Sequence, residues 1–136
     1  MNPRQYIALV SLHAFLAITA LAGGTALLLG FQTPPLALLD ASPFKSYLVP
    51  GLALAVVVGG SASVTAVMLF LRHPRAILPS LATGVAVLVF EAVEIAVIGS
   101  PAGPARAMQI LYIVIGIAIG VLSLFLKKWP SDRAHP

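Results

Sequence analysis

The residues of this sequence most suited to chemistry are two glutamates, Glu91 and Glu94, which lie inside an apolar run at residues 76–98. They are two of only four acidic residues in the chain. An ionised carboxylate at the centre of a membrane helix costs on the order of 2.5 to 3.5 kcal/mol. Two carboxylates three residues apart share one helix face, so their repulsion adds to that cost. Both side chains are therefore predicted to face protein or water inside a bundle.

The composition predicts lipid as the environment of most of the chain. Of the 136 residues, 60% are hydrophobic and 9% are charged, whereas soluble domains carry about 25% charged residues. Four apolar runs reach the roughly 20 residues that a helix needs to cross a bilayer. These runs cover residues 6–31, 51–71, 76–98 and 105–126. The predicted fold is all-α: a four-transmembrane-helix antiparallel bundle that forms a single integral membrane domain over residues 1–136.

The one long connection joins the first two spans at residues 32–50. It is predicted to lie along the outer membrane surface as a short interfacial helical loop. Two proline-initiated segments, residues 34–39 and 42–48, have the pattern of short helices, the second with a serine as N-cap. Phe44 and Tyr47 are the candidates to cap the bundle, because aromatic rings settle at headgroup level. A plain interfacial anchor is an equal alternative.

The basic residues gather at the ends of the apolar runs. If the N-terminus is cytoplasmic, Lys45 and Arg106 fall outside and the other six of the eight Lys and Arg residues fall inside, as the positive-inside tendency requires. The predicted location is the inner (plasma) membrane, with both termini cytoplasmic and no nucleic-acid partner. Arg4 and the run ending at residues 20–22 have the outline of a secretory signal, but the run continues to Phe31, which favours a retained span.

Counting helix rise from the span ends places polar side chains beside the two glutamates. Gln109 falls near the depth of Glu94, and Tyr112 and Thr25 fall near that of Glu91. An arginine near the outer end of the fourth span has a side chain long enough to reach the same depth. The predicted polar cluster, in the outer half of the bundle, consists of Glu91, Glu94, Arg106, Gln109, Tyr112 and Thr25.

A second, thinner polar layer is predicted about 10 Å from the cytoplasmic side. It consists of His13, Thr65 and Thr83. A histidine packed against a neighbouring hydroxyl is the plainer interpretation of His13, and proton handling is the alternative. The layer lies too far from Glu91 for direct pairing.

The fourth span carries a stripe of polar and small residues at helical spacing. The stripe is Gln109, Tyr112, Gly116, Gly120 and Ser123. Gly116 and Gly120 have the spacing of a small-xxx-small packing motif. We expect this motif to act within the bundle or as the contact to a second copy or another membrane protein.

Several short stretches resemble small uncharacterised four-helix bacterial membrane proteins. They are Ser42-Pro43-Phe44, Tyr47-Leu48-Val49-Pro50-Gly51, Glu91-Ala92-Val93-Glu94-Ile95, Ile98-Gly99 and Gln109-Ile110-Leu111-Tyr112. In layout, with a basic turn after the second span, the chain also looks loosely like the DoxX-like group. The resemblance implies a four-helix fold and a membrane location, and it implies no particular activity.

Three functions fit these features. The leading hypothesis is a non-enzymatic membrane module that binds a lipid-like or cationic hydrophobic molecule at a pocket around Glu91 and Glu94. The alternatives are a proton-coupled small-molecule exporter and an accessory subunit of a larger membrane complex. The sequence lacks the common hydrolase and zinc-enzyme motifs, so an enzyme is the least favoured class. Two carboxylates without further ligands are a weak metal signal, and no metal or cofactor is predicted.

Overall fold

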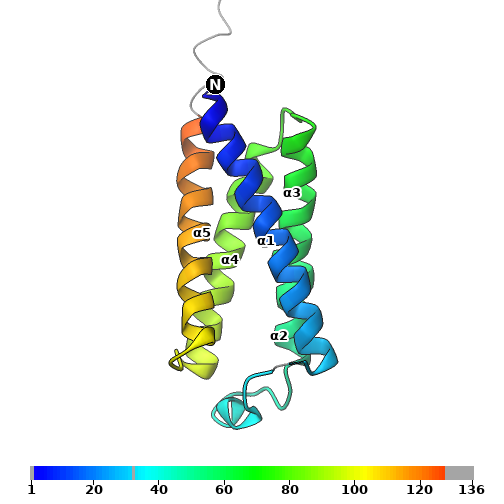
Figure 1. The fold of residues 1–136 in the computed structure, drawn as a ribbon, viewed down its shortest axis with the longest axis vertical. Coiled ribbons are helices and arrows are strands. Elements are labelled where there is room, and N and C mark those ends of the chain that lie inside the picture. The colour runs from blue at the N-terminus through cyan, green and yellow to red at the C-terminus, as the bar shows by residue number, and fades with distance from the viewer. Residues whose placement is uncertain (1, 32, 128–136) are drawn as a thin grey trace, which may run out of the picture.

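The computed structural model describes residues 2–31 and 33–127. This part of the chain is helical, with four long helices packed side by side in alternating directions (Figure 1). All four are long and apolar enough to cross a membrane, which confirms the predicted fold class. The elements are α1 (Pro3–Leu29), η1 (Leu36–Leu39), α2 (Leu48–Leu52), η2 (Ala53–Gly60), α3 (Ser61–Phe70), α4 (Ile77–Ile98) and α5 (Pro104–Lys127).

Three of these elements make one long helix. α2, η2 and α3 follow one another without a break and together form the second long helix, Leu48–Phe70. The middle element, η2, is π-helical over eight residues. A π-helical turn is wider than an α-helical one and occurs mostly in short stretches, frequently at functional sites. The second helix therefore departs from regular geometry in the half of the bundle that begins at the α1–α2 connection.

Local chemistry sets the ends of the helices. α1 begins at Pro3, and the Asn2 side chain caps it by accepting a hydrogen bond from the Arg4 amide at 3.0 Å. It ends at Gly30, whose φ of +76° is a left-handed conformation that glycine adopts at little cost. α4 likewise stops before Gly99, whose φ is +70°. The observed bounds thus differ by a few residues from those predicted.

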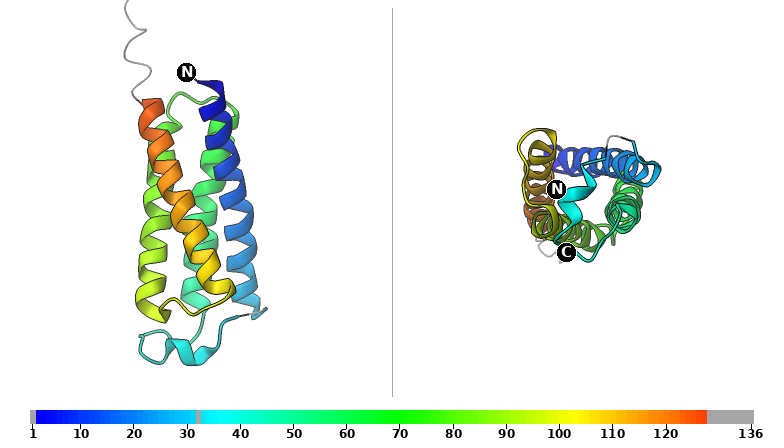
Figure 2. Two further views of the ribbon diagram at one scale, coloured as in Figure 1. Left: turned by 60° about the vertical axis from the view of Figure 1, so that its left-hand side comes forward. Right: turned by 90° about the horizontal axis from the view of Figure 1, so that it is seen from below.

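The connection between α1 and α2 lies across one end of the bundle, as the view from below in Figure 2 shows. Its first predicted helix is present as the short 3-10 helix η1. The second, predicted at residues 42–48, does not form, and that prediction was wrong. The Ser42 hydroxyl donates to the Leu39 carbonyl at 2.8 Å and accepts from the Phe44 amide at 3.2 Å. These local bonds close a turn where the sequence pattern had indicated a helix N-cap.

Close backbone contact joins α1 to the π-helical segment. A Cβ at Gly24 would lie 2.6 Å from the backbone nitrogen of Ala55, and a Cβ at Gly59 would lie 3.0 Å from the Leu21 side chain. Small residues allow such approach between helices in lipid, where packing replaces the hydrophobic effect as the main attraction. This glycine contact holds α1 against the second helix.

α4 and α5 form a second close pair. A Cβ at Gly116 would lie 2.7 Å from Val87 Cγ1, and one at Gly84 would lie 3.2 Å from the Gly116 carbonyl oxygen. The Gly116 position of the predicted motif therefore packs within the bundle. A Cβ at Gly120 would meet no atom of the described residues within 4 Å, and a contact between protomers through this stripe stays a prediction.

We predict that Gly24→Ala lowers stability relative to Gly60→Ala. Both variants add one methyl group at a helical glycine, but the new methyl at residue 24 collides with the Ala55 backbone, whereas a Cβ at Gly60 has open space in the described part of the chain. Overpacking typically costs about 1–3 kcal/mol. Thermal unfolding in detergent measures the difference between the two variants. Equal midpoints would show that α1 and η2 are not held by this contact.

Candidate functional site

A cavity of about 490 Å³ occupies the end of the bundle nearest the α1–α2 connection. Its volume lies in the range of small-molecule sites, roughly 300–1,000 Å³. The walls come from α1, the start of the second helix, α4 and α5, and the connection contributes residues as well. The polar side chains that line it are Thr19, Tyr47, Glu91, Glu94, Gln109 and Tyr112. The remaining lining residues are apolar, glycine or proline, so the site combines one polar cluster with a largely hydrophobic surface.

The carboxylates of α4 and the amide of α5 form the centre of this cluster. Glu91 and Gln109 are each only 2% exposed. Gln109 Nε2 donates to Glu94 Oε1 at 3.1 Å and to the Gly99 carbonyl at 3.0 Å. Among the described residues, the buried oxygens Glu91 Oε2 and Gln109 Oε1 have no hydrogen-bond partner. A buried acceptor without a partner costs free energy, so these two atoms are the most unusual feature of the site.

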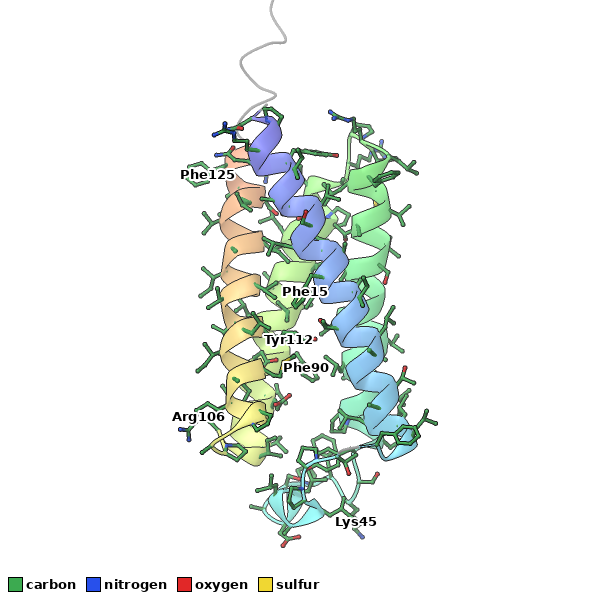
Figure 3. All side chains as sticks on the ribbon, viewed as in Figure 1. Phe15, Lys45, Phe90, Arg106, Tyr112 and Phe125 are labelled. Carbon is green, nitrogen blue, oxygen red and sulfur yellow. The ribbon has the colours of Figure 1, made fainter. Side chains whose placement is uncertain are left out.

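Tyr112 joins α5 to α1 beside the carboxylates. Its phenol donates to Thr19 Oγ1 at 2.8 Å, and Thr19 in turn donates to the Phe15 carbonyl at 2.9 Å. Figure 3 shows Tyr112 and Phe90 in the space between α1 and the α4–α5 pair. The hydrogen bond fixes the Tyr112 ring at the wall of the cavity.

The two predicted cap residues also line the cavity. Tyr47 is buried, and its hydroxyl donates to the Pro35 carbonyl at 3.2 Å. Burial raises the pKa of the Tyr47 phenol above its usual value, and the nearby charge of Glu94 raises it further. Phe44 is half-buried and lies on the same connection. Both rings therefore line the cavity at the end where the connection crosses the bundle, and their role as a cap stays a prediction.

Two residues of the predicted cluster are not brought to it. Thr25 is exposed on α1 and does not line the cavity. Its predicted position came from depth alone, and six residues of α-helix turn a side chain by about 240° relative to Thr19. Arg106 is exposed, and its Nε and Nη2 donate to the Ser100 carbonyl at 3.1 and 2.5 Å. Figure 3 shows Arg106 pointing away from the bundle. This orientation is favourable because a guanidinium keeps more of its hydration at the surface.

Thr19 is the cavity residue that sequence reasoning missed. It lies four residues before Gly23, which also lines the cavity, and the pair forms a row next to the buried stripe of α1. The sequence did contain a signal for Thr19, because residues four apart lie on the same face of a helix. Counting depth from the end of the helix did not use this spacing.

The second polar layer lies apart from the cavity. His13 Nδ1 contacts the Leu9 carbonyl at 2.9 Å, and His13 Nε2 contacts Ser80 Oγ at 3.4 Å. A carbonyl only accepts, so Nδ1 carries the proton and Nε2 accepts from Ser80 in the neutral ring. Ser80 Oγ lies 2.7 Å from Ser123 Oγ. His13 is thus packed against hydroxyl groups, and Ser80, three residues before Thr83, was not predicted to belong to the layer.

The threonines of that layer meet as well. Thr65 Oγ1 of α3 lies 3.3 Å from Thr83 Oγ1 of α4, and both residues are buried. Thr83 also donates to the Pro79 carbonyl at 3.0 Å. Hydroxyl groups therefore connect the second helix to α4 in the half of the bundle away from the cavity.

Comparison of the chain with protein-family models, with curated proteins and with solved structures found no match. The resemblance to the DoxX-like group therefore stays a prediction. Within residues 2–31 and 33–127, no group of three or more His, Asp or Glu side chains could hold a metal ion. The function is accordingly inferred from the geometry of the cavity.

We predict that Tyr112→Phe and Thr19→Val each destabilise the bundle and that their effects are not additive. Hydrogen bonds between membrane helices average about 0.6 kcal/mol and reach about 1.7 kcal/mol, so the coupling energy should fall in that range. A double-mutant cycle of unfolding in detergent measures it. Thr25→Val is the matched control on the same helix and should leave stability unchanged. Additive effects of the first two variants would contradict the link between α1 and α5.

Proposed function

We propose that the protein is an integral membrane module that binds an amphipathic small molecule, lipid-like or cationic and hydrophobic, in the cavity around Glu91 and Glu94. One observation carries the proposal. Two buried acceptors, Glu91 Oε2 and Gln109 Oε1, lack partners among the described residues and belong to side chains that line a mainly apolar cavity. A polar group buried at such a place is matched by a ligand that supplies the missing partner.

Structural pairing accounts for only part of the cluster. Gln109 bonds to Glu94 and to the Gly99 carbonyl, and these contacts tie α5 to α4 and to the turn that follows it. The buried oxygen of Glu91 takes part in no such contact within the described residues. An acid retained only to join helices would be expected to bond across the interface, because its burial is otherwise unfavourable. Glu91 is therefore the residue that most strongly supports a ligand-binding role for the cluster over a purely structural one.

The rim of the cavity suits a ligand that arrives from lipid. Several apolar side chains belong both to the lining and to the outer surface of the bundle: Val93 is 52% exposed, Val49 is 52% exposed and Met108 is 43% exposed. Large apolar side chains are also exposed along all four long helices, as expected for a lipid-facing surface. A molecule dissolved in the bilayer would reach the cavity without crossing water.

The charge distribution supports an orientation for this module. α1 begins and α5 ends at the same end of the bundle, opposite the cavity (Figure 1). The basic residues at the ends of the helices there are Arg4, Arg72, Arg75 and Lys127, whereas Lys45 and Arg106 lie at the cavity end. Lys128 and Arg133, which the sequence also assigned to the inner side, lie outside the described residues. By the positive-inside tendency, the termini face the cytoplasm of the inner membrane and the cavity lies in the outer half.

We predict that the cavity retains amphiphiles and that Ala53→Phe prevents this. Ala53 lines the cavity at the start of η2, so a ring at this position fills the space that the ligand occupies. Ala92→Phe is the control, because Ala92 follows Glu91 but is exposed on the outer face of α4. Native mass spectrometry of protein released from membranes measures co-purifying and added lipids or hydrophobic amines.

The carboxylates should contribute to the same binding. Glu91→Gln and Glu94→Gln remove charge with little change of volume, and each is expected to reduce ligand occupancy. If binding of every co-purifying and added molecule is the same in both variants, in Ala53→Phe and in the unchanged protein, the proposal is wrong. Release of a proton on addition of a cationic ligand would instead favour the proton-coupled exporter.

We predict that residues 40 and 73 lie on opposite sides of the membrane. The natural sequence contains no cysteine, so Asp40→Cys and His73→Cys each introduce a single thiol at an exposed position. A membrane-impermeant maleimide added to intact cells should label the first variant and not the second. Permeabilised cells, in which both should react, provide the control. The reverse pattern would place the termini and the basic turn outside.

A further inference from the structure

The hydrogen-bond donors of the cavity are already in use. Four lining side chains carry a donor in their usual protonation states: Thr19, Tyr47, Gln109 and Tyr112. Thr19 donates to a helix carbonyl, Tyr47 to the Pro35 carbonyl and Tyr112 to Thr19. The two amide hydrogens of Gln109 go to Glu94 and to the Gly99 carbonyl. Among the described residues, a ligand therefore finds no free side-chain donor in the lining.

The acceptors of the same cavity are in surplus. Glu91 Oε2 and Gln109 Oε1 are buried and have no partner among the described residues. The Glu94 carboxylate receives one hydrogen bond from Gln109, although a carboxylate accepts several. The Tyr112 oxygen also keeps acceptor capacity after it donates to Thr19. The described polar side chains of the cavity thus offer oxygen lone pairs, including those of two carboxyl groups, and none of them has a free hydrogen-bond donor.

From this imbalance we infer that the ligand of the cavity is an amphiphile whose head is an ammonium group bearing N–H bonds, a primary or secondary amine in its protonated form. The inference rests on the proposed binding function and narrows its ligand class. The N–H groups supply the hydrogens that Glu91 and Gln109 lack, and the positive charge offsets the two carboxylates. The apolar body of the ligand lies against the hydrophobic walls.

Other head groups fit this arrangement less well. A phosphate or carboxylate brings acceptors to a site that already has too many, and it adds like charge beside Glu91 and Glu94. A trimethylammonium group carries the charge but has no N–H, so Glu91 Oε2 and Gln109 Oε1 both stay without a hydrogen-bond donor. An alcohol donates a single hydrogen and carries no charge. Charge-assisted hydrogen bonds are roughly twice as strong as neutral ones, which favours the ammonium over the alcohol.

Aromatic rings in the lining support a cationic head as well. Phe90 and Tyr112 line the cavity together with the two carboxylates, and Phe44 and Tyr47 line it from the connection. A ligand cation over an aromatic face is attracted by the negative face of the ring. This attraction acts on any ammonium, so it contributes affinity, whereas the acceptors decide between N–H and N-methyl heads.

Protonation of Glu91 is the competing arrangement. It would remove the charge of Glu91 and give its carboxyl group a hydrogen to donate without a ligand. The site would then prefer a neutral alcohol head to an ammonium. The head-group preference of the cavity therefore distinguishes the two arrangements.

The test compares four amphiphiles that share one chain: decylamine, decyltrimethylammonium, decanol and decanoate. Native mass spectrometry of the full chain in lipid nanodiscs measures competition among them. We expect decylamine to bind at least about tenfold more tightly than decyltrimethylammonium and decanol, since one hydrogen bond to a charged group corresponds to roughly that factor. Decanoate should not bind. Binding of none of the four would overturn the proposed function, whereas equal or stronger binding of the trimethylammonium, the alcohol or the anion would overturn only this inference.

Two variants test whether the preference for the ammonium head group comes from the polar side chains of the cavity. Glu91→Gln replaces one orphan acceptor by an amide donor, so it should reduce the preference for decylamine about tenfold or more while decanol still binds. Arg106→Gln changes the charge at the same end of the bundle but lies outside the cavity, and it should leave the preference unchanged. An unchanged preference in Glu91→Gln would contradict the inference even if the variant is less stable, because the comparison is made within one protein.

Discussion

A carboxyl group buried in an apolar bundle needs compensation from the protein or from a ligand, and Glu91 imposes this condition on the rest of the structure. The helices around it supply polar groups only in part. α5 contributes Gln109, which bonds to Glu94, and Tyr112, which bonds to Thr19 of α1. The buried Glu91 oxygen remains unmatched among the described residues. The bundle is therefore polar at this end, and the Glu91 oxygen can still accept a hydrogen bond from a further group.

The cavity exists because the helices pack closely in pairs. Glycine contacts hold α1 on the π-helical segment and α5 on α4. α1 also crosses the bundle at an angle, near α5 at the end that carries the termini and away from it at the other end (Figures 1 and 2). Space therefore opens between the pairs where the α1–α2 connection crosses. The same geometry that seals His13 at one end leaves room beside Glu91 at the other.

Hydropathy and helix breakers were sufficient to predict the four long helices, because lipid selects runs of this length and proline or glycine ends them. Helix rise also placed Gln109 and Tyr112 correctly beside the glutamates, since α4 and α5 form a tight hairpin with a short turn. The same counting failed for Thr25, because helix rise gives the depth of a side chain but not the face of the helix that carries it. Gly24 packs against Ala55, and the next residue, Thr25, is exposed. Arg106 and the 42–48 segment failed for another reason: nearby carbonyls and hydroxyls satisfied their polar groups locally.

The contrast between the two polar layers supports the proposal that the layer at the cavity end is a binding site. In the layer of His13, a hydroxyl can both donate and accept, so the bonds from Leu9 through Ser80 to Ser123 form a closed set. This chain therefore has the means to bury polar groups with their partners in place. In the layer at the cavity end, the donors of Thr19, Tyr47, Gln109 and Tyr112 go to backbone carbonyls and to one another or Glu94. The buried acceptors Glu91 Oε2 and Gln109 Oε1 receive no hydrogen bond from the described residues. The bundle thus satisfies the hydrogen bonds of one polar layer and leaves two acceptors without donors in the other layer, beside a cavity. This difference is expected where a ligand provides the missing donors.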